Sequence, residues 1–260
     1  MPELPDLEIY KENLKSKILN KKIIGASVLK PQVLKQLSES NFNRKTVGKT
    51  VKNIERQGKF LVFNFSSKEK MVIHLMLYGQ LQWVKTTEKK SADACLILEF
   101  KDNSLRFVDG TAWMKVTFDS KEIDKVGLEP LSVEFTKEKL QKILKKKRLG
   151  NVKERLVDQK LIAGIGNAYV DEILWKARIH PARVASLLKN NEIKSLYQAI
   201  PKILREAVGE VRKRLKGEVS GEPRDFLAIH RKKECPQCGA KIKRIELNKK
   251  GTYFCPSCQK

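Results

Sequence analysis

The chain has 260 residues, 41% of them hydrophobic, and its 54 Lys and Arg against 30 Asp and Glu give a formal net charge of +24. This size allows one large domain or two smaller ones, and the charge argues against an ordinary enzyme of small acidic metabolites. A polyanion is the expected partner: DNA, RNA or an anionic membrane surface. The alternative is a generally lysine-rich composition. The sequence lacks the run of about 18 apolar residues that a membrane span needs, and its acidic, proline-containing start is unlike a signal peptide.

The first half of the chain reads as one helix followed by short strands. Leu7, Tyr10, Leu14 and Ile18 recur at helical spacing, which predicts an amphipathic helix over residues 7–19. Strand-like runs follow, separated by turn residues, at 22–29, 59–65, 71–84, 95–100, 105–108 and 113–118. This pattern is typical of an antiparallel sandwich or barrel.

The second half is expected to be helical and far more basic. Residues 1–135 carry about +6 and residues 136–260 about +18, which indicates two functional parts. Residues 127–131 read as a linker, and the helical pattern over 136–217 is interrupted at Gly164, Gly166, Pro181 and Pro201. We therefore predict an α+β, multi-domain protein: a β-sandwich domain with a flanking helix over 1–130, a helical domain over 131–225 and a cysteine-rich domain over 226–260.

The four cysteines of the tail have the spacing of a zinc ribbon. Cys235 and Cys238 form one Cys-x2-Cys pair, and Cys255 and Cys258 form another after sixteen intervening residues. Each pair can place two thiolates on one tetrahedral ion, and the ion replaces a hydrophobic core that so short a segment cannot build. A disulfide framework fits poorly with a chain without an export signal. Cys95 lies in an apolar strand and is expected to be a buried thiol.

The first three residues offer a nucleophile. Methionine before proline is readily removed, which would leave Pro2 with a free secondary amine of pKa near ~8. Such an amine attacks a sugar aldehyde carbon to give an iminium, which acidifies the neighbouring C2′ hydrogen and promotes loss of the 3′ phosphate. Glu3 stands beside it as a candidate acid or base. Taken alone, this terminus is weak evidence.

Several motifs in chain order resemble the formamidopyrimidine-DNA glycosylase / endonuclease VIII family. They are Met1-Pro2-Glu3-Leu4-Pro5-Asp6-Leu7-Glu8, Gly58-Lys59-Phe60, Ile73-His74-Leu75 with Gly79, Gly164-Ile165-Gly166-Asn167-Ala168-Tyr169, Ile179-His180-Pro181 and the zinc ribbon. The resemblance implies an N-terminal β-sandwich, a helix–two-turn–helix domain and a zinc finger, with DNA across the cleft between domains.

The resemblance also assigns roles to individual residues. It implies that Pro2 is the Schiff-base nucleophile, Glu3 the acid or base, and Lys59 a phosphate ligand that assists elimination. Gly166 and Asn167 would bring the backbone and an amide close to phosphate. Lys250 aligns with the arginine of the zinc hairpin, keeping its charge but losing the bidentate fork.

Flipping a nucleotide leaves a gap in the duplex that wedge residues must fill. The resemblance places Leu77 and Trp113 at wedge positions, although both are equally well interpreted as core residues at strand spacing. The family arginine that faces the orphaned base is replaced by Thr111. His74 and His180 lie in apolar or turn contexts and are expected to be structural.

The segment from Asp225 to Cys235 is much shorter than in formamidopyrimidine glycosylases, which carry there a loop over flipped 8-oxoguanine. We therefore expect a monomeric base-excision-repair DNA glycosylase and abasic-site lyase with one structural zinc and no other cofactor. It would act on damaged double-stranded DNA in the cytoplasm, at the nucleoid, without a membrane partner. Oxidised pyrimidines, ring-opened purines and abasic sites rank above 8-oxoguanine. The alternatives are a non-catalytic damaged-DNA-binding relative and a zinc-ribbon RNA- or ribosome-associated protein, which leaves Pro2-Glu3 unexplained.

Overall fold

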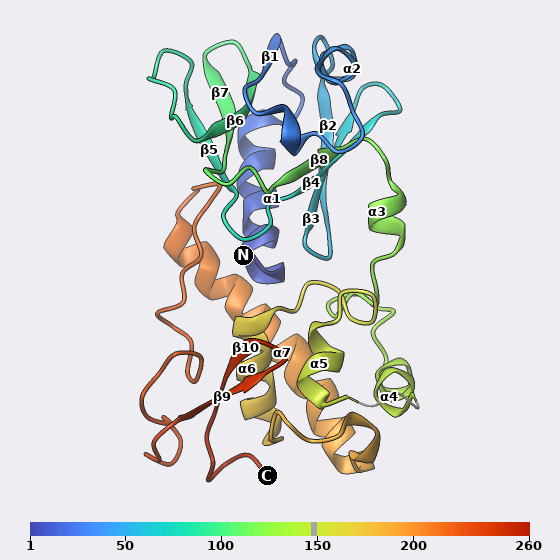
Figure 1. Ribbon diagram of the computed structural model, residues 1–260, viewed down its shortest axis with the longest axis vertical. Coiled ribbons are helices and arrows are strands. Elements are labelled where there is room, and N and C mark those ends of the chain that lie inside the picture. Colours follow the sequence, from blue (N-terminus) through green and yellow to red (C-terminus); the bar gives the residue numbers. More distant parts are fainter. Residues whose placement is uncertain (147–149) are drawn as a thin grey trace. The chain divides into compact units, whose positions relative to one another are not determined.

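The computed structural model describes residues 1–146 and 150–260, which form two compact units (Figure 1). Unit 1 comprises Met1–Lys125 and Val211–Pro223, and unit 2 comprises Val126–Glu210 and Arg224–Lys260. The units are described separately below. The predicted domain limits at residues 130 and 225 stay predictions.

Unit 1 contains two four-stranded antiparallel sheets. One has the order β1-β6-β7-β5, and its strands are β1 (Gly25–Val28), β5 (Gln80–Lys85), β6 (Ala94–Glu99) and β7 (Asn103–Val108). The other has the order β2-β3-β4-β8, with β2 (Val51–Gln57), β3 (Phe60–Phe65), β4 (Lys70–His74) and β8 (Lys115–Thr117). Short helices complete the unit: η1 (Pro31–Val33), α2 (Glu39–Thr46) and α3 (Lys121–Asp124). The predicted antiparallel β-domain is confirmed.

Helix α1 (Leu4–Ile18) lies between these sheets, as Figure 1 shows. The residues expected on its apolar face are buried, and so are Leu4 on the same face and Ile9 on another. The predicted amphipathic helix is confirmed, since Glu12, Lys15 and Ser16 on its polar face are partly or fully exposed. Burying each large apolar side chain stabilises the fold by about 1.5–3 kcal/mol, so α1 is firmly anchored in unit 1.

Several elements of unit 1 differ from the sequence-based prediction. The run 71–84 is two strands, β4 and β5, because a tight turn interrupts it: Met76 has a φ of 55°, and a Cβ on Gly79 would lie 2.3 Å from the carbonyl oxygen of Leu75. Strand β2 and helix α2 were not predicted. In β2 only Val51 and Ile54 are buried, so its hydrophobic pattern is too weak to identify a strand.

Unit 2 is mainly helical and ends in a hairpin. Its elements are α4 (Lys137–Lys145), α5 (Val152–Val157), α6 (Asn167–Ala177), η2 (Ala185–Leu187), β9 (Lys243–Leu247) and β10 (Lys250–Phe254). Helix α7 (Asn190–Leu215) begins in unit 2 and ends in unit 1. The predicted interruption before Asn167 is confirmed, since Gly166 is the N-cap of α6.

The predicted break at Pro201 is wrong, because Pro201 lies inside α7. A proline in a helix interior costs about 3 kcal/mol through its missing N–H and its ring. Buried side chains at helical spacing continue on both sides of it, with Ile193, Leu196 and Ile200 before and Leu204 after. Their burial outweighs the local cost, so the helix continues through the proline.

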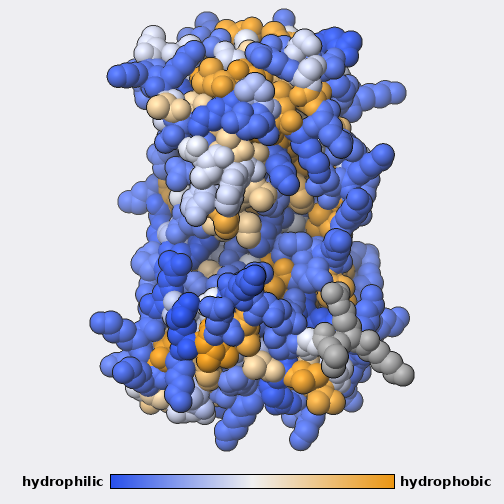
Figure 2. All heavy atoms as spheres, in the orientation of Figure 1, coloured by the Kyte–Doolittle hydropathy of each residue, from blue (hydrophilic) through white to orange (hydrophobic). Residues whose placement is uncertain are grey.

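Hydrophilic side chains cover most of the face drawn in Figure 2, as the composition leads one to expect. Within the part of the chain that the structure describes, none of the helices is both long and apolar enough to span a bilayer.

His74 ends β4 and is held neutral by its surroundings. Its Nδ1 accepts a hydrogen bond from the backbone N–H of Met76 at 3.0 Å, and its ring packs edge-on against Phe60. Burial lowers the pKa of His74 to about 4, and the nearby charges of Lys59 and Lys115 act in the same direction, against a smaller opposing effect of Glu122. The expected structural role of His74 fits these contacts.

We predict that His74 makes unit 1 sensitive to acid. The unfolded chain takes up a proton on His74 below pH 6.5, whereas the folded chain takes it up only near pH 4, so stability is lost as pH falls between these values. The loss is about 2–3 kcal/mol. His74→Asn keeps an acceptor but does not titrate, so its free energy of unfolding in urea should fall less between pH 7 and pH 4.5. An equal fall in both proteins would contradict this account.

Candidate functional site

The start of the chain is buried in unit 1. Glu3 is the N-cap of α1 and forms a capping box with Asp6, whose carboxylate accepts the Glu3 backbone N–H at 2.8 Å. Pro2 is buried, and Glu3 is only 4% exposed. The ammonium of Met1 lies 3.1 Å from Oε1 of Glu222. The terminal residues, which fray in most proteins, are therefore held in place here.

The segment that carries Glu222 follows α7 and lies along α1. The Tyr10 hydroxyl donates to the carbonyl oxygen of Gly221, and the Asn13 amide donates to that of Glu218, both at 2.7 Å. Side chains of α1 thus fix the course of residues 218–222. The carboxylate of Glu222, which comes from a distant segment, thus lies next to the amino terminus.

Lys59 is placed by a polar chain that begins on α1. Glu8 pairs with Nε of Arg56 on β2 at 2.9 Å, and Nη1 of Arg56 donates to the carbonyl oxygen of Gly58 at 3.0 Å. Gly58 has a φ of 56°, which glycine adopts without strain, so the chain can turn directly into Lys59. Lys59 is 6% exposed. The turn that leads into Lys59 is therefore fixed relative to α1, the helix that begins directly after Pro2 and Glu3.

Arg56→Ala should release this turn. The substitution removes the Glu8 ion pair and the bond to Gly58, which we expect to cost about 2 kcal/mol, and it should make Lys59 react faster with an amine-acetylating reagent. Mass spectrometry of the labelled protein measures that rate. Arg44→Ala is the matched control, because it removes an exposed arginine of unit 1 that bonds the Asn41 side chain. Unchanged labelling of Lys59 in Arg56→Ala would refute the role of Arg56.

Leu77 and Trp113 are on the surface, so their interpretation as core residues is wrong. Leu77 is 47% exposed and Trp113 is 53% exposed. Tyr78, which the sequence analysis did not single out, is 58% exposed, and its ring centroid lies 6.0 Å from that of Trp113. The wedge role of Leu77 and Trp113 stays a prediction.

Asp109 fixes the loop that presents Trp113. Its carboxylate accepts the backbone N–H groups of Thr111, Trp113 and Met114, all at 2.9 Å, and the Thr111 hydroxyl at 2.6 Å. Burial alone would raise the pKa of Asp109, but these hydrogen bonds outweigh it and lower the pKa. Thr111 is thus bonded inside its own loop.

In unit 2, the turn before α6 is organised by Gln159. Its Oε1 accepts the N–H of Gly164 at 2.9 Å, and its Nε2 donates to the carbonyl oxygen of Ile165 at 2.7 Å. Gly164 has a φ of 79°, a conformation that favours glycine. The turn delivers the chain to Gly166 and Asn167 at the start of α6. Sequence reasoning found the glycines but not Gln159.

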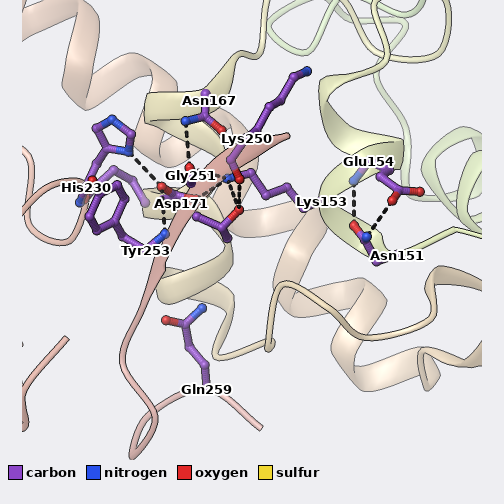
Figure 3. A network of polar contacts seen from close by, with 12 residues as sticks. Asn151, Lys153, Glu154, Asn167, Asp171, His230, Lys250, Gly251, Tyr253 and Gln259 are labelled. Carbon is purple, nitrogen blue, oxygen red and sulfur yellow. Dashed lines mark hydrogen bonds and ion pairs between the residues drawn. The ribbon is translucent and has the colours of Figure 1, made fainter. Parts of the chain in front are cut away.

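Asn167 and Lys250, which the sequence analysis treated separately, are brought together. Nδ2 of Asn167 donates to the carbonyl oxygen of Gly251 at 2.9 Å, and Gly251 follows Lys250 at the start of β10 (Figure 3). Oδ1 of Asn167 is buried and has no hydrogen-bond partner among the described residues. The Lys250 side chain is exposed and extends away from the network in Figure 3.

A buried polar network beside them was missed by sequence reasoning. Lys153 of α5 lies 2.8 Å from Oδ1 of Asp171 on α6 and 2.9 Å from the Thr252 hydroxyl. Oδ2 of Asp171 lies 2.7 Å from Nδ1 of His230 and accepts the N–H of Tyr253 at 3.2 Å. One carboxylate thus joins α5, residue 230 and the hairpin to α6 (Figure 3). The available signal was an aspartate within the apolar run of α6.

Asp171→Asn should destabilise unit 2 strongly. Lys153 is 2% exposed and would lose the negative charge that compensates its burial, which costs about 3–5 kcal/mol. Adding Lys153→Met should recover part of that loss, because it removes the uncompensated ammonium. Urea unfolding measures both variants. Lys139→Ala, which breaks an exposed pair with Glu134, is the control and should cost under about 1 kcal/mol. A comparably small cost for Asp171→Asn would contradict the account.

The segment 225–235, which ends at the first cysteine, is held on α6 by Glu172. The Glu172 carboxylate accepts the backbone N–H groups of Ala228 and Ile229 at 2.9 Å and of His230 at 2.8 Å. Burial raises the pKa of Glu172, while these three bonds oppose the rise. Three consecutive residues of this segment are therefore fixed on α6.

The four cysteine sulfurs are arranged for a metal ion. They lie within 4.8 Å of one another, with separations of 3.9 Å between Cys235 and Cys258 and 3.5 Å between Cys238 and both Cys255 and Cys258. A tetrahedral zinc with Zn–S bonds of about 2.3 Å places its sulfurs about 3.8 Å apart. The donors therefore fit zinc, and the four thiols suggest a structural ion.

The thiols differ in acidity. Burial opposes ionisation of Cys235, but backbone N–H groups of Gln237 and Cys238 outweigh it and lower its pKa to about 7. Burial and then the neighbouring thiols raise the pKa of Cys258 to about 12. A bound cation would supply the charge needed to deprotonate the whole set.

Comparisons with known families match three parts of the chain. The formamidopyrimidine-DNA glycosylase N-terminal domain matches residues 1–116, and the formamidopyrimidine-DNA glycosylase H2TH domain matches residues 126–216. A zinc finger found in FPG and IleRS matches residues 232–260.

Curated relatives match along their full length. The chain is 36% identical to the formamidopyrimidine-DNA glycosylase of Carboxydothermus hydrogenoformans, covering 100% of both chains, and 35% identical to that of Pelotomaculum thermopropionicum, covering 100% of this chain and 99% of the relative.

Among solved structures, a complex of the Lactococcus lactis Fpg with DNA containing an abasic site is similar, with a TM-score of 0.90, 28% identity and 99% coverage of both chains. A complex of the same bacterium's protein with DNA containing FAPY-dG has a TM-score of 0.91 at 28% identity, covering 99% of this chain and 100% of that one.

Proposed function

This chain belongs to the formamidopyrimidine-DNA glycosylase family, and we propose that it is a base-excision-repair DNA glycosylase with abasic-site lyase activity that works through Pro2. The observation that carries this proposal is the state of the amino terminus. Pro2 and Glu3 are buried and are held by the start of α1. A protein that did not use its amino terminus would not need to hold these residues in place. Removal of Met1 then exposes a secondary amine at a fixed position.

The proposed chemistry uses this amine as nucleophile. The neutral amine of Pro2 attacks C1′ of the damaged nucleoside, the bond from C1′ to the base breaks, and the base leaves with a proton. The sugar ring opens to a cationic iminium, which needs no added proton because the amine is secondary. A base then removes the C2′ proton, and the electron pair expels the 3′ phosphate. We propose that Glu3, the next residue along the chain, exchanges protons with the sugar ring oxygen.

Lys59 is proposed to bind the phosphate next to the lesion and assist its departure. Lys59 directly follows a turn that Arg56 holds through the carbonyl oxygen of Gly58. Lys59 is largely buried, and a cation that is shielded from water interacts strongly with a phosphate. His74 is held neutral nearby, which leaves the positive charge with the lysine.

The remaining predicted DNA contacts belong to both units. Gly166 is the N-cap of α6 and Asn167 is its first residue, and the start of a helix favours an anion. The exposed Lys250 directly precedes Gly251, whose carbonyl oxygen accepts a hydrogen bond from Asn167. We propose these three as phosphate contacts. Leu77 and Trp113 are proposed as wedges, because both are exposed apolar side chains.

The lesion range is proposed from the short segment 225–235. Three of its residues are fixed by Glu172, and Cys235 belongs to the cysteine cluster, so little chain is left to cover a flipped purine. This favours oxidised pyrimidines, ring-opened purines and abasic sites over 8-oxoguanine. The DNA of one similar solved complex contains FAPY-dG, a lesion of the second of these classes.

One structural zinc on the four cysteines is proposed as the cofactor, with no other, and damaged double-stranded DNA as the partner of a monomer. When bound, zinc fixes the hairpin that carries Lys250. A cytoplasmic, nucleoid-associated location is proposed from the DNA substrate, and no membrane partner is expected.

A second candidate function is damaged-DNA binding without catalysis. Thr111 is bonded to Asp109 and cannot replace the missing arginine, and Lys250 lacks the fork of the family residue. Base release from a panel of lesion oligonucleotides separates the two, because the binding protein forms complexes but no product.

Borohydride trapping tests the proposal directly. Reduction converts the iminium on abasic DNA into a permanent cross-link, so protein that begins at Pro2 should form one. Pro2→Gly should trap at least tenfold more slowly, since a primary amine must keep a proton to stay cationic. Pro31→Gly, which removes an exposed proline of unit 1, is the control and should trap at the wild-type rate. Equal rates for Pro2→Gly and wild type would refute the role of Pro2.

A further inference from the structure

We propose that Glu154 is a positioning residue for DNA binding, because it holds the apex of the hairpin that carries Lys250. This inference rests on the proposed function, in which Lys250 contacts a phosphate of the DNA backbone. It adds to that function a carboxylate of α5 that touches no DNA itself and acts by keeping the lysine in place.

The first observation is a hydrogen bond between two distant segments of unit 2. The side-chain amide of Asn248, in the turn between β9 and β10, donates to Oε1 of Glu154. The same oxygen accepts the amide of Asn151, the N-cap of α5, at 2.7 Å (Figure 3). The other side of the carboxylate is closely packed, since a Cβ on Gly150 would lie 2.8 Å from Oε2. One constrained carboxylate therefore connects the start of a helix to the apex of the hairpin.

The second observation is the backbone of the apex. Asn248 has a φ of 50° and Lys249 a φ of 59°. Two successive residues with positive φ form the type I′ turn that joins neighbouring antiparallel strands, and its second place is usually a glycine. A lysine in this conformation is strained, and strained residues persist where their surroundings hold them. The bond from Asn248 to Glu154 supplies that constraint.

The consequence is that β10 is held on both sides of Lys250. Before it, Glu154 fixes the apex, and after it the carbonyl oxygen of Gly251 accepts the Asn167 amide at 2.9 Å. A lysine lacks the planar fork that orients an arginine on a phosphate, so its placement depends on the backbone that carries it. Fixing that backbone in advance reduces the entropy lost when the ammonium binds a phosphate.

The charge of Glu154 by itself acts in the opposite direction. A carboxylate near a phosphate-binding lysine repels DNA, so removing it should strengthen binding if charge alone mattered. A positioning role predicts weaker binding after the same change. The two accounts therefore differ in the sign of the effect.

Binding to a duplex with a tetrahydrofuran abasic analogue, measured by fluorescence anisotropy, tests the positioning role. Glu154→Ala should weaken binding about three- to tenfold, because the hairpin apex must then be ordered on the DNA. Glu154→Gln removes the same charge but keeps an oxygen for Asn248, and should bind within about twofold of the wild type. Glu246→Ala, which removes an exposed carboxylate of β9, is the control and should not weaken binding.

Two further variants exclude a loss of folding as the cause. Asn248→Gly removes the amide but places at the apex a residue that adopts a positive φ without strain. It should weaken binding as Glu154→Ala does, with the wild-type zinc content and unfolding temperature. In a Lys250→Ala background, Glu154→Ala should cause little additional loss, because two residues that act through one contact are not additive.

Borohydride trapping of the wild type separates this inference from the proposed function. If the wild type forms the cross-link but Glu154→Ala and Asn248→Gly bind as tightly as it does, the role of Glu154 is overturned and the function stands. Equal weakening by Glu154→Ala and Glu154→Gln, or a full additional loss in the Lys250→Ala background, also overturns it. A wild type that binds the duplex without a cross-link overturns the catalytic function, and the same binding series still decides the role of Glu154. A wild type that does not bind overturns both.

Discussion

The capping box that begins α1 is the interaction on which the proposed chemistry depends. A nucleophile at a chain terminus is useful only if the terminus does not fray. Here Asp6 closes the first turn on Glu3, and the apolar side chains of the helix that follows are buried in unit 1. The rest of unit 1 extends from that anchor. Arg56 connects the helix to the turn of Lys59, and Tyr10 connects it to the segment of Glu222.

In unit 2, a buried carboxylate holds separate segments in fixed positions. The Asp171 carboxylate contacts the Lys153 ammonium, the His230 ring and the backbone N–H of Tyr253. Residues far apart in sequence therefore meet on α6. Hydrophobic contacts alone tolerate small shifts in register, whereas a carboxylate with three fixed donors does not. The consequence is a defined position for the hairpin, which places Lys250 beside Asn167. The cysteine cluster lies at the other end of the same hairpin.

How far the sequence alone could lead depended on the kind of interaction. Helix α1, the antiparallel sheets and the cysteine cluster follow from spacing, which is a local property. The continuation of α7 through Pro201 could not be foreseen, because burial of its flanking residues against other segments decides it. Lys153, Asp171 and Gln159 were missed for the same reason, since their partners are distant or are backbone atoms. Tyr78 was passed over because exposure is invisible in sequence.

The most direct measurement identifies the atom that is joined to DNA. Protein processed to Pro2 is cross-linked to abasic DNA with borohydride, digested with trypsin and nuclease, and sequenced by mass spectrometry. The account predicts a deoxyribose remnant on the peptide from Pro2 to Lys11, attached to the proline nitrogen. A remnant on Lys59 or another lysine, with the terminal peptide unmodified, would contradict it.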